Sequence, residues 1–339
     1  MFVPCVLKSV SPAGDLSVTV GHRVLDDYLV FVAGRARPNT LLATAFDLQV
    51  FFAWVGKEPA EVTSADVIDF ANAQRSPQSK VVRLSDGGGG LSARTVARRL
   101  SIISGLYAYL VARGDVGVTA NPVPRGLGTR RGRRNGDRVA PLMRTPRTLP
   151  RILEPAEVDA LFAALRTLRD RAMVEAMVLG GLRRCEVLGL RLGDLQVAQR
   201  RVFIAEGKGG HQRQVPISAR FFATVAAYLD AERPAGASTD RVFVALKGPR
   251  RGQPLSPTGL DEIMTGARGR AGLERGTCHE LRHTCLTRLR EAGMALEAVQ
   301  AQAGHQSIET TRIYLHLADD WLASEYRRAS EAIDAQVIR

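Results

Sequence analysis

The 339-residue sequence is poor in cysteine and in long apolar runs, and each shortage excludes a class of protein. The four cysteines (Cys5, Cys185, Cys278 and Cys285) are few and unevenly spaced, which excludes a disulfide scaffold and fits a reducing compartment. No run reaches the roughly 20 apolar residues that a membrane-spanning helix needs. The N-terminus lacks the basic region and long apolar core of a secretory signal. We therefore expect a cytoplasmic protein with no membrane partner.

Acidic residues are also scarce relative to basic ones. The chain has 34 Asp and Glu against 47 Lys and Arg, which gives a formal net charge of +13 and a pI of about 10.3. An excess of positive charge does not specify a fold, but it favours polyanionic partners, with nucleic acid first and anionic membrane second. The nucleotide-binding pattern G-x-x-x-x-G-K-[ST] is absent as well, so nothing in the sequence indicates ATP binding.

The N-terminal part of the chain has helical periodicity after an irregular leader over residues 1–16. Apolar residues recur at helical spacing over Asn39–Val55, and Thr63–Gln74 opens with a Thr-x-x-Asp capping box. A third helix is predicted over Ser92–Gly114, with Ser as its N-cap and Gly at the position that follows its end. We expect a small helical domain over residues 17–120.

Residues 121–150 form a segment rich in Arg, Gly and Pro that has a single acidic residue, Asp137. Such a composition cannot bury apolar surface, so we expect an extended chain. It is either a solvated linker between domains or, as we prefer, a linker that lies along a phosphate backbone.

The second domain is predicted to span residues 151–339. Helical patterns cover its first part, and β-branched and aromatic residues on either side of Gly-Lys-Gly-Gly predict a β-hairpin over residues 201–218. The remainder is mostly helical. The predicted fold class is therefore mainly α, with a small antiparallel β-hairpin in the second domain.

The stretch HELRH, His279–His283, fits two patterns at once. As H-E-x-x-H it matches the zinc-protease signature, which places two histidines one helical turn apart with a glutamate that activates water. As His-x-x-Arg-His, its important residue is Arg282. The two interpretations imply unrelated chemistries, and the rest of the second domain has to decide between them.

Four other short stretches of this domain carry polar groups that a plain core does not need. They are GLRRCEVLGL with Arg183 and Glu186, GKGG with Lys208, AGHQS with His305, and ETTRIYLH with Tyr314. Arg183 and Glu186 are three residues apart, so on a helix they share a face and can pair. Each stretch alone has a plain structural explanation, such as a surface salt bridge or a half-buried tyrosine.

Taken in chain order, the five stretches resemble the catalytic block of the tyrosine recombinase (phage integrase) family of DNA breaking-and-joining enzymes. That block runs Arg…Lys…His-x-x-Arg…His/Trp…Tyr, and GLRRCEVLGLRLGDL, TPRTLPRILEPAEVDALF and GHQSIETTRIYLH resemble further family segments. Cys185 departs from the Ser or Gly expected at its position. The resemblance implies a helical, SAM-like core-binding domain followed by a mostly α catalytic domain with a small antiparallel sheet.

The resemblance also implies a set of site residues. The catalytic ones are Arg183, Lys208, His279, Arg282, His305 and Tyr314, with Glu186 and His283 in support. Tyr314 is the expected nucleophile, His279 the base and Lys208 the acid that protonates the leaving 5′ oxygen. Glu186 orients Arg183, and for His283 packing is preferred to proton transfer.

The chemistry of these side chains suits transfer of a DNA phosphodiester. The transition state has extra negative charge on the non-bridging oxygens, and preorganised donors aimed at that charge stabilise it. Arginine is always charged and can donate two parallel hydrogen bonds to a phosphate. Two arginines and a histidine can replace the metal that many nucleases use, so we expect no metal and no cofactor. Exchange of one phosphoester for another is near energy-neutral, so no ATP is needed.

The zinc interpretation of HELRH meets two objections. The metzincin continuation requires Gly three residues after the second histidine, where Leu286 stands, although Glu297 or Glu309 could serve as a third ligand. Arg282 would also place a permanent cation within one turn of a divalent metal, which costs Coulomb energy. A zinc hydrolase therefore stays a minor alternative, and Glu280 is expected on the helix surface or in support of the site.

The expected partners are double-stranded DNA recombination sites, further copies of the chain in a homotetramer, and accessory or directionality proteins. The residues expected to contact DNA are Arg94, Arg98, Arg99, Arg130, Arg131, Arg133 and Arg134. Family likeness indicates that the amphipathic segment after Tyr314 docks on a neighbouring subunit, and packing on its own domain is the alternative. A mobile-element recombinase in the nucleoid is the leading hypothesis. A type IB topoisomerase and a DNA-binding protein without catalysis are the others.

Overall fold

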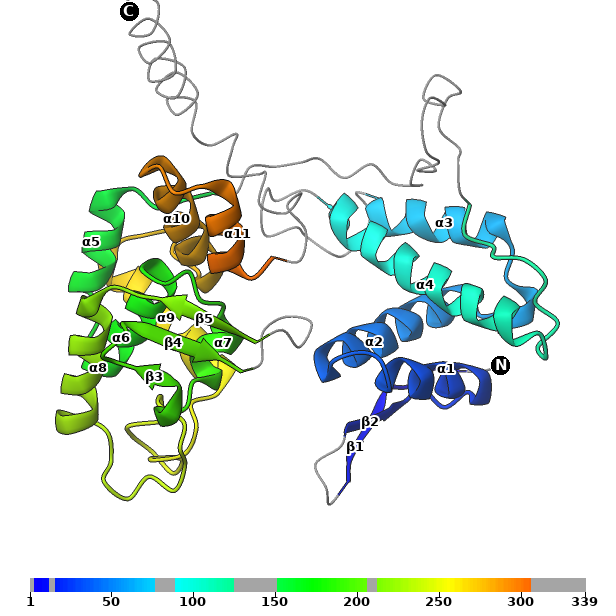
Figure 1. The fold of residues 1–339 in the computed structure, drawn as a ribbon. Coiled ribbons are helices and arrows are strands. Elements are labelled where there is room, and N and C mark those ends of the chain that lie inside the picture. Colours follow the sequence, from blue (N-terminus) through cyan, green and yellow to red (C-terminus); the bar gives the residue numbers. More distant parts are fainter. Residues whose placement is uncertain (1–2, 12–15, 77–88, 125–150, 206–211, 306–339) are drawn as a thin grey trace, which may run out of the picture. The chain divides into compact units, whose positions relative to one another are not determined.

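The computed structural model describes residues 3–11, 16–76, 89–124, 151–205 and 212–305. The chain divides into two compact units, Met1–Arg147 and Thr148–Arg339. Helices dominate both units, and each has a small antiparallel sheet (Figure 1). Among the described helices, none is long and apolar enough to cross a membrane. The domain boundaries and the basic linker drawn from the sequence stay predictions, since most of residues 121–150 lie outside the described ranges.

The first unit is a helical domain, as its sequence periodicity predicts. Its described elements are β1 (Leu7–Val10), β2 (Leu16–Thr19), α1 (Arg23–Ala33), α2 (Pro38–Val55), η1 (Pro59–Glu61), α3 (Ser64–Arg75) and α4 (Ala93–Arg113). The predicted caps explain where two of these helices begin. Thr63 and Asp66 form the capping box of α3, and the Ser92 hydroxyl accepts from the Thr95 N–H at the start of α4. Gly114 ends α4 in the left-handed conformation, φ 77°.

Aromatic and aliphatic side chains from the four helices form the core of this unit. Phe51 of α2 packs edge-on against Phe70 of α3, with ring centroids 5.1 Å apart. Tyr107 of α4 is buried in the same core, and its hydroxyl donates to the Pro59 carbonyl at 2.9 Å. Because the hydroxyl has an acceptor, its burial leaves no polar group unsatisfied.

The prediction of an irregular leader over residues 1–16 is wrong for part of that segment. Leu7–Val10 forms strand β1, which pairs antiparallel with β2 in the register Leu7↔Thr19 to Val10↔Leu16. All four β1 residues are exposed, so the strand has no buried face. A strand of four exposed residues lacks the apolar alternation by which strands are found in a sequence.

The second unit surrounds helix α6 (Leu168–Val178), which is buried over most of its length. The other described elements are α5 (Pro155–Ala163), α7 (Arg184–Gly189), η3 (Leu192–Asp194), β3 (Leu195–Gln196), β4 (Arg201–Ile204), β5 (Arg213–Pro216), α8 (Ala219–Ala231), α9 (Pro257–Ala271), α10 (Cys278–Glu291) and α11 (Leu296–Ala303). α6 packs against α7, α8 and α10 (Figure 1). A helix buried on most sides offers a fixed support for the elements around it.

The predicted hairpin is present as β4 and β5, paired in the register Arg201↔Pro216 to Ile204↔Arg213. A third strand, β3, adds to the sheet in the order β3-β4-β5. Strand β3 was not predicted from the sequence, because two residues are too few to show a period. Val202, Ile204 and Val215 point into the core, so the sheet has one buried face.

Candidate functional site

The HELRH stretch lies in the first two turns of α10. Thr277 is its N-cap, and the Glu280 carboxylate accepts from the backbone N–H groups of Gly276 (3.0 Å) and Thr277 (2.9 Å). Burial acts to raise the pKa of Glu280, but these backbone hydrogen bonds hold it below its ordinary value. The Glu280 carboxylate therefore caps the N-terminus of α10. This structural role explains the glutamate of H-E-x-x-H without zinc chemistry.

The two histidines of this stretch face each other on α10. The Nε2 atoms of His279 and His283 are 2.8 Å apart, and the rings meet edge to face with centroids 4.2 Å apart. Within the described ranges, no group of three or more His, Cys, Asp or Glu side chains is arranged to hold a metal ion. The geometry of the pair suits the passing of a proton, because one ring nitrogen donates to the other.

Arg183 is the N-cap of α7, at the end of the turn that leaves α6. Its backbone N–H donates to Glu186 Oε2 at 2.9 Å, and its Nη1 donates to Glu186 Oε1 at 2.8 Å. Its Nη2 donates to the Gly304 carbonyl at 3.2 Å. The predicted pairing of Arg183 with Glu186 is therefore present, but Glu186 is buried rather than on a surface. A buried carboxylate fixes the direction of the guanidinium more firmly than an exposed one would.

Arg282 is 2% exposed and connects three segments of the second unit. Its Nη1 donates to the Gly181 carbonyl, and its Nη2 donates to the Ala303 carbonyl at 2.6 Å. The same Nη2 lies 3.2 Å from His305 Nε2, and Nη1 lies 4.0 Å from Glu186 Oε2. Gly181 has φ +66°, a left-handed conformation that glycine favours. The backbone thus presents two carbonyls that hold Arg282 close to His305 and Glu186.

His305 follows directly after α11, which ends at Gly304 in the left-handed conformation, φ 59°. Glycine is favoured at this position, directly after the end of a helix. The His305 N–H donates to the Gln300 carbonyl at 3.2 Å, and the Gln300 side chain donates to the His305 carbonyl at 3.1 Å. Hydrogen bonds on both sides of the residue fix the backbone at this point.

The three imidazoles of the site share one electrostatic environment. Burial, and after it the charges of Arg282 and Arg183, lower the pKa of His305 to about 4. Burial and the neighbouring His279 and Arg282 lower the pKa of His283 to about 4. The pKa of His279 is lowered for the same physical reasons, by burial and by the two arginines. All three are neutral at neutral pH and so can accept a proton.

Arg213 of β5 belongs to this site and was not predicted from the sequence. Its Nη1 and Nη2 donate to the two oxygens of Glu186, each at 2.9 Å. Burial acts to raise the pKa of Glu186, but Arg213 and Arg183 together hold it below its ordinary value. In the sequence, Arg213 lies three residues after GKGG, and nothing distinguishes it from the many other arginines of the chain.

The described structure thus brings together six of the eight predicted catalytic and supporting residues. They are Arg183, Glu186, His279, Arg282, His283 and His305. Lys208 and Tyr314 lie outside the described residues, as do the segment after Tyr314 and Arg130, Arg131, Arg133 and Arg134. Their roles stay predictions.

The three arginines of α4 that were expected to contact DNA differ in their surroundings. Arg94 is exposed. Arg98 and Arg99 both pair with Asp47 of α2, which is 3% exposed, and Arg99 also donates to Gln74. Arg99 therefore has a structural role in joining α4 to α2 and α3. Contact with DNA stays a prediction for all three.

Comparison with known families agrees with the geometry. The phage integrase family model matches residues 151–320, and the model of the phage integrase N-terminal SAM-like domain matches residues 25–114. The chain belongs to the phage integrase family. It is a tyrosine recombinase, an enzyme of site-specific recombination.

Named relatives are similar over almost the whole chain. Tyrosine recombinase XerC of Pseudomonas fluorescens is 31% identical over 310 residues, which cover 91% of this chain and 96% of the relative. Tyrosine recombinase XerC of Xylella fastidiosa (strain 9a5c) is 31% identical over 319 residues, with the same two coverages of 91% and 96%. This recombinase is therefore XerC-like in sequence.

Solved structures show the same fold. The XerH site-specific recombinase, in a post-cleavage complex with its palindromic difH substrate, has a TM-score of 0.65 and 20% identity over 89% of this chain and 84% of that one. A lambda integrase dimer bound to a COC′ core site has a TM-score of 0.62 and 19% identity, over 86% and 94%. Both likenesses confirm the mainly α fold class predicted from the sequence.

Proposed function

We propose that this recombinase cuts and rejoins duplex DNA through a 3′-phosphotyrosyl intermediate, without metal or ATP, at the recombination sites of a mobile element. The observation that carries the proposal is the fixed pair of guanidiniums. Arg183 and Arg282 are held by Glu186 and by backbone carbonyls beside His305. Donors fixed before the substrate arrives need no reorganisation during the reaction, and that is how such donors stabilise a transition state.

In the proposed reaction, the two guanidiniums and His305 bind the non-bridging oxygens of one phosphate. The Tyr314 oxygen attacks phosphorus, its proton passes to His279, and the bond to the 5′ oxygen breaks as Lys208 protonates that oxygen. A neutral His279 supports the role of base, since its depressed pKa leaves the imidazole unprotonated at neutral pH. Its contact with His283 gives the proton a second acceptor.

The partners follow from the same proposal. The recombinase binds double-stranded DNA sites; among proteins of similar fold, XerH binds its palindromic difH substrate and lambda integrase binds a COC′ core site. It acts as a homotetramer on two sites, with the segment after Tyr314 docked on a neighbouring subunit, and it works with accessory or directionality proteins. Fold likeness to the Tn1549 transposon integrase, with a TM-score of 0.64 and 17% identity, is consistent with service to a mobile element.

The function is tested by sequencing DNA junctions in cells that express the chain beside its native locus. The expected result is rejoining of two defined sites, and the sequences flanking the junctions define a suicide duplex nicked beside the cleavage position. Relaxation of one duplex without rejoining of two would instead indicate a topoisomerase. The suicide duplex then serves the assays described below.

Cleavage of this suicide duplex is expected to survive EDTA. The arginines supply the positive charge that a metal would otherwise supply, so the yield of covalent protein–DNA complex should stay within about twofold of its value without chelator. The measurement is the fraction of labelled DNA retained with protein on a denaturing gel. A loss that zinc restores would instead support the zinc interpretation of HELRH.

Replacement of Lys208 by Ala should slow cleavage by roughly 10² to 10⁴-fold, the usual contribution of a general acid. Substitution of sulfur for the leaving 5′ oxygen should restore most of that loss, because a thiol ionises near pH 8.5 and leaves without a proton. Lys247, in the turn region after Val244, provides the matched control: Lys247→Ala should cleave both substrates at wild-type rates. A Lys208→Ala enzyme as slow on sulfur as on oxygen would remove Lys208 from this role.

A further inference from the structure

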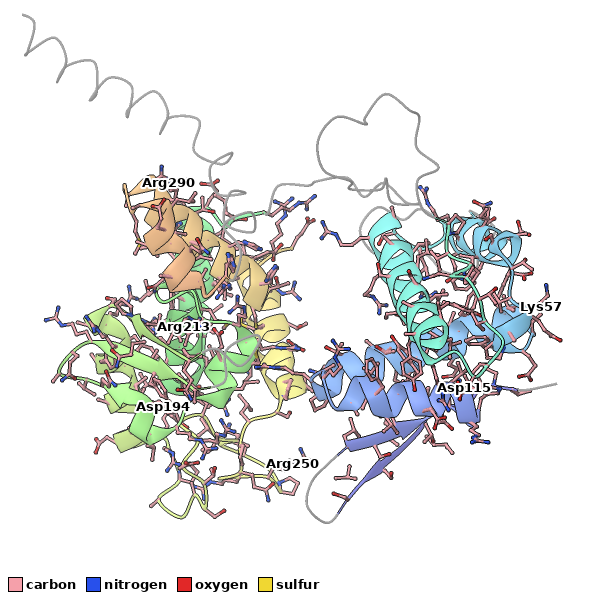
Figure 2. The ribbon with its side chains drawn as sticks, turned by 45° about the vertical axis from the view of Figure 1, so that its right-hand side comes forward. Lys57, Asp115, Asp194, Arg213, Arg250 and Arg290 are labelled. Atoms are coloured by element: carbon pink, nitrogen blue, oxygen red, sulfur yellow. The ribbon has the colours of Figure 1, made fainter. Side chains whose placement is uncertain are left out.

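Arg213 makes the most complete contact with Glu186 of any residue described in the site. It donates two hydrogen bonds of 2.9 Å in parallel, one to each carboxylate oxygen. The side chain is itself mostly buried, and it lies within the second unit at the start of β5 (labelled in Figure 2). A bidentate contact of this kind fixes the plane of the carboxylate as well as its position.

Glu186 is the acceptor that Arg213 and Arg183 share. Oε1 accepts from the Nη1 atoms of both arginines, and Oε2 accepts from Arg213 Nη2 and from the Arg183 backbone N–H. The carboxylate has no exposed surface, so its charge is balanced by these neighbours rather than by water. Loss of Arg213 would therefore leave Arg183 as its main partner and free the carboxylate to rotate.

Arg213 also lies against the backbone that leads to His305. A Cβ added at Gly304 would be 2.8 Å from Arg213 Cζ, so the glycine allows the guanidinium to approach the chain closely. The Gly304 carbonyl accepts from Arg183, and the preceding Ala303 carbonyl accepts from Arg282. Arg213 thus lies against two of the supports of the arginine pair, the Glu186 carboxylate and the end of α11.

We propose that Arg213 is a positioning residue, which holds Glu186 and the Gly304 backbone so that the Arg183 guanidinium is aimed at the scissile phosphate. The inference rests on the proposed function, because it assumes that Arg183 binds the phosphate. The proposal places Arg213 in support of Arg183, since both of its terminal nitrogens donate to the carboxylate that also accepts from Arg183. The loss of its support should therefore affect the same chemical step as the loss of Arg183.

The test compares Arg213→Gln with the wild-type enzyme on two substrates that differ in charge. One is the nicked suicide duplex, and the other has a methylphosphonate at the scissile position, where a neutral methyl replaces one non-bridging oxygen. With less negative charge in the transition state, an aimed guanidinium contributes less. Arg213→Gln should slow phosphodiester cleavage by about 10- to 100-fold, the range found when the hydrogen-bond partner that orients a metal ligand is removed. It should slow methylphosphonate cleavage far less.

The readout is the ratio of the methylphosphonate rate to the phosphodiester rate, because a general loss of folded protein lowers both rates equally. The ratio measured for Arg183→Gln gives the size of the effect expected when the phosphate-binding guanidinium is absent. Arg201→Gln is the control: Arg201 lies on β4 of the same sheet, is exposed, and contacts the side chain of Gln214 at 3.3 Å. This control should leave the ratio at the wild-type value. Thermal unfolding and DNA affinity are measured for every variant.

Two further variants keep the test independent of folding. Arg213→Lys retains the charge but cannot make the bidentate contact, so its ratio should fall between those of the wild type and Arg213→Gln. Gly304→Ala leaves Arg213 in the chain but places a Cβ against its guanidinium at a left-handed backbone position, and it should raise the ratio as well.

The outcomes separate this inference from the proposed function. A raised ratio in both Arg183→Gln and Arg213→Gln supports the positioning role. A raised ratio in Arg183→Gln with a wild-type ratio in the folded Arg213 variants overturns it and leaves the proposed function intact. An unchanged ratio in Arg183→Gln means that this arginine does not neutralise the phosphate, so the proposed function fails and the positioning role fails with it.

Discussion

Replacement of Tyr314 by Phe should abolish the covalent protein–DNA complex and leave DNA affinity within about threefold of wild type. The phenyl ring keeps the shape and apolar surface of tyrosine but has no oxygen to attack phosphorus. Affinity for DNA comes mainly from many phosphate contacts, so the loss of one hydroxyl removes little of it. The two measurements are gel retention under native conditions and covalent capture of the nicked suicide duplex after denaturation.

The other tyrosines of the chain give this experiment its control. Tyr28, Tyr107 and Tyr109 lie in the first unit, away from the residues of the catalytic domain in sequence. Tyr228 is buried in the second unit, and its hydroxyl donates to the Val242 carbonyl at 3.1 Å. Burial raises the pKa of Tyr228, which makes it a poor nucleophile. The remaining candidates for the nucleophile are Tyr314 and Tyr326.

Tyr326→Phe is therefore the matched control, since it removes a hydroxyl from the same C-terminal part of the chain. It should form covalent complex at the wild-type rate. If Tyr314→Phe still formed the complex and Tyr326→Phe did not, the nucleophile would be Tyr326 and the match of ETTRIYLH to the nucleophile segment of the family would be misleading.

The helices and the order of the catalytic residues could be predicted from the sequence because both depend on local signals. The capping box at Thr63 and Asp66, the Ser92 cap and the glycine after α4 are each read within four residues of a helix end. Arg183, Arg282 and His305 could be found because their spacing matches a family pattern. The helix caps could therefore be predicted from the residues alone, whereas prediction of the site residues needed the resemblance to the tyrosine recombinase family.

Apart from Glu186, which lies three residues from Arg183, the supports of the site could not be predicted, because they connect residues that are far apart in the sequence. Arg213 is 27 residues from Glu186, and its bidentate contact depends on how β5 packs beside α7. The Gly181 and Ala303 carbonyls that hold Arg282 are 101 and 21 residues from it, and a backbone carbonyl carries no signature in a sequence. The pairing of Arg98 and Arg99 with Asp47 was missed for the same reason.

Replacement of Arg282 by Lys should slow covalent complex formation by about 10² to 10³-fold, as expected when one donor to a developing oxyanion is lost. The variant keeps a positive charge, so the loss tests geometry rather than charge. Arg282 uses Nη1 for the Gly181 carbonyl and Nη2 for the Ala303 carbonyl, and Nη2 also lies 3.2 Å from His305. A lysine has one nitrogen at the end of a single chain, so it cannot contact both carbonyls and a phosphate together.

The same substitution should also lower stability, because at least one buried carbonyl loses its donor. An unsatisfied buried acceptor costs about 1–3 kcal/mol, so the midpoint of thermal unfolding should fall by several degrees. Cleavage is therefore measured well below that midpoint, where the variant is folded. Arg191→Lys is the control, because Arg191 pairs with Asp240 at 2.7 Å on an exposed surface, and such pairs contribute little.

An Arg282→Lys enzyme that is folded and cleaves within tenfold of the wild type would contradict the central role of the guanidinium pair. In that case a single positive charge at this position would suffice for cleavage. The hydrogen bonds from Arg282 to the Gly181 and Ala303 carbonyls would then contribute only to stability. Slow cleavage by a stable Arg282→Lys enzyme, beside an unaffected Arg191→Lys enzyme, would show the opposite. It would mean that the two carbonyls fix the direction of Arg282 because the reaction needs its planar, two-pronged end.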